Sequence, residues 1–168
     1  MREAHDSNGD VQAMQANRQE LVDSIRKNDL VELTGLPRPP KGLHENMVLM
    51  VHLLQSTAEW GGPPDKLPVP KPGSGEAFAP GAGEARCCVR RLGGARHCPV
   101  LMKCLQGPRG PVHLFDIAPS ALEAVKEWEG TDYLEPQFLA KMNTAASILA
   151  QWRVSMLAEW EALKRTES

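Results

Sequence analysis

The sequence predicts an all-α fold, in which a small helical head sits on two long arms that form an antiparallel coiled coil. Apolar residues recur at three- and four-residue steps in two blocks near opposite ends of the chain. A stretch rich in proline and glycine separates the two blocks. Each terminal helix has a narrow apolar stripe that needs one partner, and the other terminal helix can supply it. We therefore expect the head to lie between the paired arms, with a disordered Pro/Gly-rich insert.

The outgoing arm is predicted at residues 11–34, after a disordered start at 1–10. Arg18 interrupts the stripe of this arm, and two interpretations of this residue are open. We prefer a side chain that snorkels to water near a helix end. The alternative is a seam that is not locked in one register. The stripe itself consists of Val11, Met14, Leu21 and Ile25.

A corner and the first head helix are predicted at residues 35–60. The stretch "TGLPRPP" provides Gly35 for a left-handed cap and Pro37 to end the preceding helix. Residues 40–57 then predict an amphipathic helix packed on a core. Its predicted inner face is Leu43, Met47, Met50, Val51 and Leu54, and its predicted outer face includes Lys41, His44, Glu45 and His52.

The insert is predicted at residues 61–97 as a disordered segment. Positions 61–85 contain six prolines and six glycines. Such a composition buries too little apolar surface to offset the entropy of ordering the chain. Arginine and lysine without any acidic residue follow at 86–113.

The remaining head helices are predicted at 98–148 and the returning arm at 149–168. Proline starts a helix at 119–128. From Pro136 to Arg165 no further proline or glycine occurs, which predicts a single helix about 40–45 Å long. The predicted core residues of the head are Met47, Met50, Leu54, Leu122, Leu149 and Trp152.

Two segments in this order carry a family resemblance. "LVDSIRKNDLVELTGLPRPPKGLHENMVLMVHLLQSTAEW" (21–60) resembles the end of the outgoing stalk helix and the first head helix of the dynein heavy chain stalk tip. "YLEPQFLAKMNTAASILAQWRVSMLAEWEALKR" (133–165) resembles the last head helix of that microtubule-binding domain and its returning stalk helix. The resemblance covers about 11–60 and 98–165, and the insert departs from it. It identifies the chain as similar to a divergent dynein-heavy-chain-domain-containing protein.

The resemblance implies a function in microtubule-based movement. The stalk tip of this family binds the acidic surface of tubulin through basic side chains, and a change of coiled-coil register relays binding to the motor ring. The implied partners are the microtubule and, through a longer parent chain, the dynein complex. The implied location is the cytoplasm and cytoskeleton, or the axoneme of a cilium or flagellum. The microtubule-binding candidates carried over are Lys41, His44, Lys103, Arg109 and Lys141.

Other classes of function have less support in the sequence. The net charge of −2 gives no nucleic-acid signature, and no apolar stretch is long enough to span a membrane. No phosphate-binding G-x-x-x-x-G-K-[ST] motif occurs, so we expect a binding module, with no catalytic residue, cofactor or metal. A zinc site is a weaker alternative, because the available thiols and imidazoles lack C-x2-C spacing. They are Cys87, Cys88, His97, Cys98, Cys104 and His113.

A rival interpretation keeps the stalk-tip fold without its track. In that case the chain is a regulatory scaffold that binds a protein partner through residues 61–113. The small number of candidate cations favours this scaffold, whereas the corner and the returning helix are compatible with both functions.

Overall fold

The computed structural model describes residues 2–26, 28–29, 32, 42–57, 69–75, 105 and 112–167, without the side chains of 2–8 and 167. These residues form helices and turns and contain no strand, so the described part of the chain is all-α as predicted. The proline corner at 34–40 and the four cysteines lie outside the described residues.

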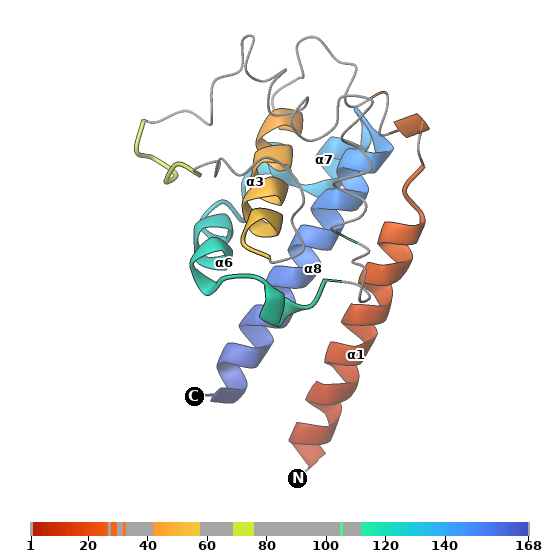
Figure 1. Cartoon of the computed structure of the whole chain (residues 1–168), viewed down its shortest axis with the longest axis vertical. Coiled ribbons are helices and arrows are strands. Elements are labelled where there is room, and N and C mark those ends of the chain that lie inside the picture. The colour runs from red at the N-terminus through yellow and green to blue at the C-terminus, as the bar shows by residue number, and fades with distance from the viewer. Residues whose placement is uncertain are drawn as a thin grey trace.

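Two helices from opposite ends of the sequence lie side by side. Helix α1 spans Arg2–Asp23, and helix α8 spans Thr144–Glu167. They contact each other and run in opposite directions, so that the N- and C-termini lie at the same end of the molecule (Figure 1). We call this the terminal end, and we call the opposite end, where α7 and the start of α8 lie, the head end. At ~1.5 Å per residue, the 24 residues of α8 extend about 36 Å.

The first arm begins earlier and ends earlier than predicted. Residues 2–10, predicted as a disordered start, belong to α1. Helix α1 ends at Asp23, although the predicted arm extends to residue 34, and residues 28, 29 and 32 beyond this break are helical again. Ser24 turns the chain, since its hydroxyl donates to the carbonyl of Leu21 at 2.7 Å. The side chain thus competes for a carbonyl that a continued helix would use.

Helix α3 spans Leu43–Gln55 and is enclosed on almost every side. Gly42 precedes it with φ +103°, and an added Cβ there would lie 2.3 Å from the carbonyl oxygen of Tyr133. Glycine is therefore needed for the close approach as well as for the backbone conformation. All five residues of the predicted inner face are buried, and Glu45 and His52 of the predicted outer face are half-buried. His44 departs from the prediction, because it belongs to the predicted outer face and is buried as well.

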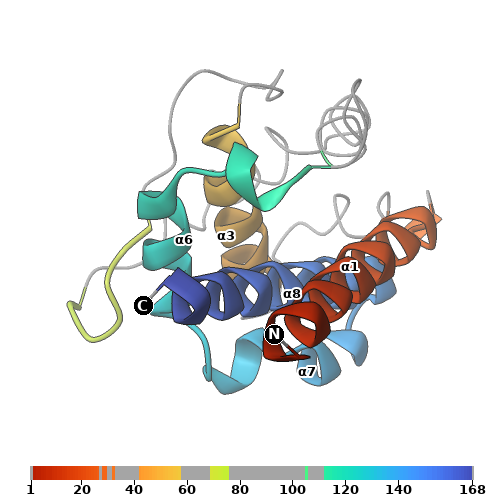
Figure 2. The ribbon, with the colours of Figure 1, turned by 90° about the horizontal axis from the view of Figure 1, so that it is seen from below.

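A smaller layer of helices covers α3 and α8. Helix α6 spans Pro119–Lys126 and packs on α3, after the short helix η1 at Leu114–Asp116. Helix η2 spans Asp132–Leu134 and leads into α7 at Pro136–Ala140. Figure 2 shows α3 and α6 on one side of α8 and α7 on the other. Helix α8 is therefore the central element of the head.

The single helix predicted from Pro136 to Arg165 is in fact two helices. Helix α7 ends at Ala140, and α8 begins at Thr144. Between them Asn143 accepts the backbone N–H of Ala146 at 2.9 Å through its side-chain oxygen, which is the bond of an N-cap. The same side chain donates to the carbonyl of Asp29 at 3.0 Å. A short polar side chain thus separates the helices without proline or glycine.

The core forms where α3, α6 and α8 meet. Its members include Leu122, Val125, Leu149 and Met156. All six residues predicted as core are buried, which confirms that part of the prediction: Met47, Met50, Leu54, Leu122, Leu149 and Trp152.

One part of the predicted insert is ordered. Residues 69–75 lie beside the end of α6, where the indole N–H of Trp128 donates to the carbonyl of Pro70 at 2.7 Å. Pro70 is buried, whereas Lys71 and the residues up to Gly75 are exposed. The prediction of disorder does not hold for this short stretch, and the rest of 61–97 lies outside the described residues.

Candidate functional site

The structure describes two of the five candidate contact residues, His44 and Lys141. Lys41, Lys103 and Arg109 lie outside the described residues. Because Gly42 packs against Tyr133 and Leu139, the first turn of α3 and the end of α7 lie close together. The two described candidates therefore come from segments that meet at the head end of the molecule (Figure 1).

His44 does not face outward as predicted. It lies in the first turn of α3 and is 7% exposed. A buried imidazole cannot contact the surface of a partner unless the head repacks. The prediction that His44 contacts a partner at the surface is therefore corrected, because its side chain is buried inside the head.

Lys141 is exposed in the turn between α7 and α8. Among the described residues it forms no ion pair. An unpaired surface ammonium presents its full charge to an approaching partner, since no neighbouring carboxylate neutralises it. Lys141 is therefore the candidate cation with a suitable position in the described structure.

The seam between α1 and α8 contains buried charge. Arg18 is 4% exposed, and its Nη2 lies 2.6 Å from Oε2 of Glu159, which is 1% exposed. The other oxygen of Glu159 accepts Nε2 of Gln15 at 2.8 Å. Nη1 of Arg18 also donates to the hydroxyl of Ser155 at 3.2 Å. Arg18 is thus neither a snorkelling side chain nor a sign of a loose seam, because a buried carboxylate holds it.

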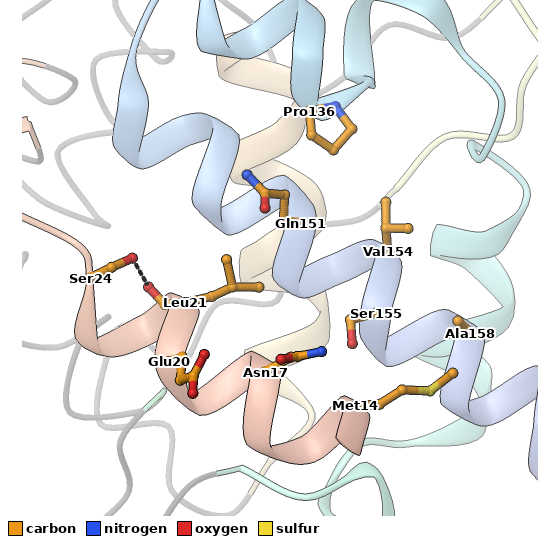
Figure 3. A pocket seen from close by; sticks show the side chains of 10 residues that line it. All are labelled: Met14, Asn17, Glu20, Leu21, Ser24, Pro136, Gln151, Val154, Ser155 and Ala158. Carbon is orange, nitrogen blue, oxygen red and sulfur yellow. Dashed lines mark hydrogen bonds between the residues drawn. The ribbon is translucent and has the colours of Figure 1, made fainter. Parts of the chain in front are cut away.

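A groove lies along the other side of the same seam. Its volume is about 630 Å³, and side chains from both helices point into it (Figure 3). Glu20 is the charged residue of its lining, and Pro136 closes one side. The lining residues are Met14, Asn17, Glu20, Leu21, Ser24, Pro136, Gln151, Val154, Ser155 and Ala158. The groove is therefore mixed in character, since apolar residues such as Leu21 and Val154 and polar residues such as Asn17 and Gln151 line it together.

A second buried polar network ties the head to α8. Arg153, only 1% exposed, donates to the side-chain oxygen of Asn46 at 3.3 Å and to the carbonyl of Leu134 at 2.8 Å. It also forms an ion pair with Glu129. The amide group of Asn46 in turn donates to the carbonyl of Ala146 at 3.2 Å. One guanidinium thus connects α3, α8 and the segment between α6 and α7.

Burial changes the titration of this ion pair. It raises the pKa of Glu129, and the charge of Arg153 offsets that rise only in part. Burial likewise lowers the pKa of Arg153, against the opposing effect of Glu129. Both charges pay a desolvation cost, as is general for ion pairs removed from water.

Sequence reasoning missed Glu159, Arg153 and Asn46. A signal for the two residues in α8 was present, since Arg153 follows Leu149 by four positions and Glu159 follows Met156 by three. Charged residues at core positions of a helix indicate buried partners. The partners themselves lie far away in the sequence and could not be read from it.

The described residues offer no metal centre. Among them no three His, Cys, Asp or Glu side chains gather as a metal site requires. His113 is exposed, and the other residues of the weak zinc alternative, Cys87, Cys88, His97, Cys98 and Cys104, lie outside the described part. None of the described helices combines the length and hydropathy needed to cross a membrane.

Comparison with known proteins gives no assignment. No family model matches the chain, and no curated protein matches its sequence significantly.

Proposed function

We propose that this chain is a microtubule-binding stalk tip of the dynein-heavy-chain type. The observation that supports this function is the antiparallel pair of α1 and α8, with both termini at one end and the head at the other. A stalk tip requires this arrangement, because both arms must lead back toward a motor ring. The resemblance of 21–60 and 133–165 to that family motivates the proposal.

Lys141 is the proposed contact to tubulin. It is exposed at the head end, where a track would meet the molecule, and no described residue neutralises it. An acidic tubulin surface would attract this charge through an exposed electrostatic interaction that salt weakens. Lys41, Lys103 and Arg109 remain candidates from the sequence.

Helix α8 is the proposed relay. It begins three residues after Lys141 and ends at Glu167 near the terminal end. A displacement of its first turn therefore reaches the far end of the molecule through one continuous helix. In the proposed mechanism this displacement changes the coiled-coil register of the two arms.

Microtubule co-sedimentation tests the proposal, with the two arms fused to a stable antiparallel coiled coil. Pelleting should occur at low salt, weaken near physiological salt and fall severalfold in Lys141→Glu. Lys71→Glu is the matched control, since Lys71 is also exposed but lies in the loop beside α6. Equal loss in both variants would indicate a nonspecific charge effect and would contradict a contact at Lys141.

The second candidate function is the regulatory scaffold, and two observations favour it. His44 is buried and so does not contribute to a basic surface. Trp128 holds the segment at Pro70, while the following residues up to Gly75 extend into solvent as a partner-binding loop would. If a folded sample fails to pellet with microtubules at low salt, the scaffold becomes the better explanation.

A further inference from the structure

The seam between α1 and α8 has one fully buried ion pair among weaker contacts. The side chains of Arg18 and Glu159 are 5% and 2% exposed. Their neighbours in the stripe of α1, Val11 and Met14, are only half-buried. The polar contacts of the seam thus concentrate on the carboxylate of Glu159, which accepts from two residues one turn apart, Gln15 and Arg18.

These contacts distinguish one direction of sliding from the other. If α1 moved by one turn toward the head end, Val11 and Met14 would take the places of Gln15 and Arg18 at Glu159. The carboxylate would then be buried against apolar groups. If α1 moved one turn the other way, Gln19 would replace Gln15, and Arg18 would contact Glu159 as it now contacts Ser155. Only the first movement separates the charges.

We propose that Arg18 and Glu159 form a register stop, which prevents α1 from sliding one turn toward the head end along α8. An uncompensated charge in a buried site is strongly disfavoured, and single buried polar groups are known to fix the register of paired helices. We expect the stop to disfavour the shifted register by at least about 100-fold. The inference concerns α1 and α8 alone and holds whether or not the chain binds a microtubule.

The register can be measured with two spin labels and pulsed dipolar spectroscopy. Suitable sites are Ala13 in α1 and Thr144 in α8, both exposed. Each is replaced by cysteine, and Cys87, Cys88, Cys98 and Cys104 are replaced by serine. Thr144 lies at the head end, so a one-turn slide of α1 toward that end shortens the distance between the labels by about 5 Å. The unmodified ion pair should give one distance.

The test variant is Arg18→Met with Glu159→Met, which keeps side-chain volume and removes both charges. A second population should appear at the shorter distance and rise at least about tenfold above that of the parent chain. The matched control is Lys126→Met with Glu161→Met, which removes an ion pair between α6 and α8 outside the seam. This control should keep the single distance.

Each result bears on the proposal. A double-methionine variant with the unchanged single distance would overturn it, and so would a new population only at longer distance. If circular dichroism shows that this variant does not fold, Arg18→Gln with Glu159→Gln is measured in its place. Its neutral side chains can still form a hydrogen bond, and the same short-distance population is expected. If the short-distance population is absent in this glutamine variant, the register stop is overturned as well.

Discussion

Replacing Arg153 by methionine tests the buried network that joins α3 to α8. The guanidinium donates to the side-chain oxygen of Asn46 and the carbonyl of Leu134, and it pairs with Glu129. Arg153→Met keeps most of the volume, so the principal loss is that of the three donor groups. The variant thus measures the contribution of the hydrogen bonds and the ion pair separately from the contribution of packing.

The expected cost follows from the acceptors that remain. Each of the two uncharged acceptors, on Asn46 and Leu134, would be left without this donor at a cost of about 1–3 kcal/mol. The side chain of Glu129 is 32% exposed and can regain water, so its contribution is small. Removal of the desolvation penalty of Arg153 offsets part of the sum. We expect a net loss of about 2–4 kcal/mol, since two acceptors lose a donor and the offset removes part of the sum.

Urea denaturation followed by tryptophan fluorescence measures this loss. Lys141→Met is the control for removing a cation from an exposed site, and it should change the free energy of unfolding by less than about 0.5 kcal/mol. The free energy of unfolding of Arg153→Lys should lie between that of the parent chain and that of Arg153→Met, because an ammonium keeps the charge but cannot reproduce the planar fork of a guanidinium. A loss below about 1 kcal/mol in Arg153→Met would refute the reasoning, since it would mean that the acceptors find other donors.

Three further changes probe packing, backbone conformation and titration. Trp152→Ala should cost about 3–5 kcal/mol in urea denaturation, because Trp152 is 2% exposed in the core; a loss no larger than that of Val154→Ala, at an exposed site, would contradict its placement. Gly42→Ala should lower stability by more than the ~1–3 kcal/mol that a positive φ costs, since the new Cβ would also clash with the Tyr133 carbonyl. Gly130→Ala, at φ +86° with open space around the new Cβ, measures the conformational cost alone, and an equal decrease in melting temperature in both variants would disprove the clash. Burial raises the pKa of Glu129 in the folded chain above its ordinary value of 4.5, so the contribution of this group to stability is complete below pH 4.5 and falls as pH rises through the raised pKa. The free energy of unfolding, measured as a function of pH across this range, should therefore change less steeply in Glu129→Gln, and identical slopes in the two proteins would exclude this group.

Periodicity predicted the helices whose apolar residues face a core. The predicted helix at 119–128 corresponds to α6, and Leu122, a predicted core residue, is buried together with Val125. Pattern reasoning succeeded there because a proline marks the start and the apolar spacing marks the inner face. It was less successful where one side chain decides a boundary, as Asn143 does between α7 and α8.

The candidate site was predicted less well than the fold. Lys141 is exposed, but His44 is buried, although periodicity places it on the polar side of α3. Helix α3 contacts α6, α8 and η2. Helical periodicity predicts that such a polar residue is exposed, because it considers only the helix to which the residue belongs. Its environment depends on what packs there, and those segments are far away in the sequence.

The sequence by itself determined the all-α class, the six core residues and the helical character of both ends of the chain. These properties depend on local propensity and on apolar spacing within single segments. Only the tertiary structure decided the pairing of Arg18 with Glu159 and the convergence of three segments on Arg153. The free energy of a buried charge depends on the partner that reaches it, and that partner is brought by the fold and not by neighbours in sequence.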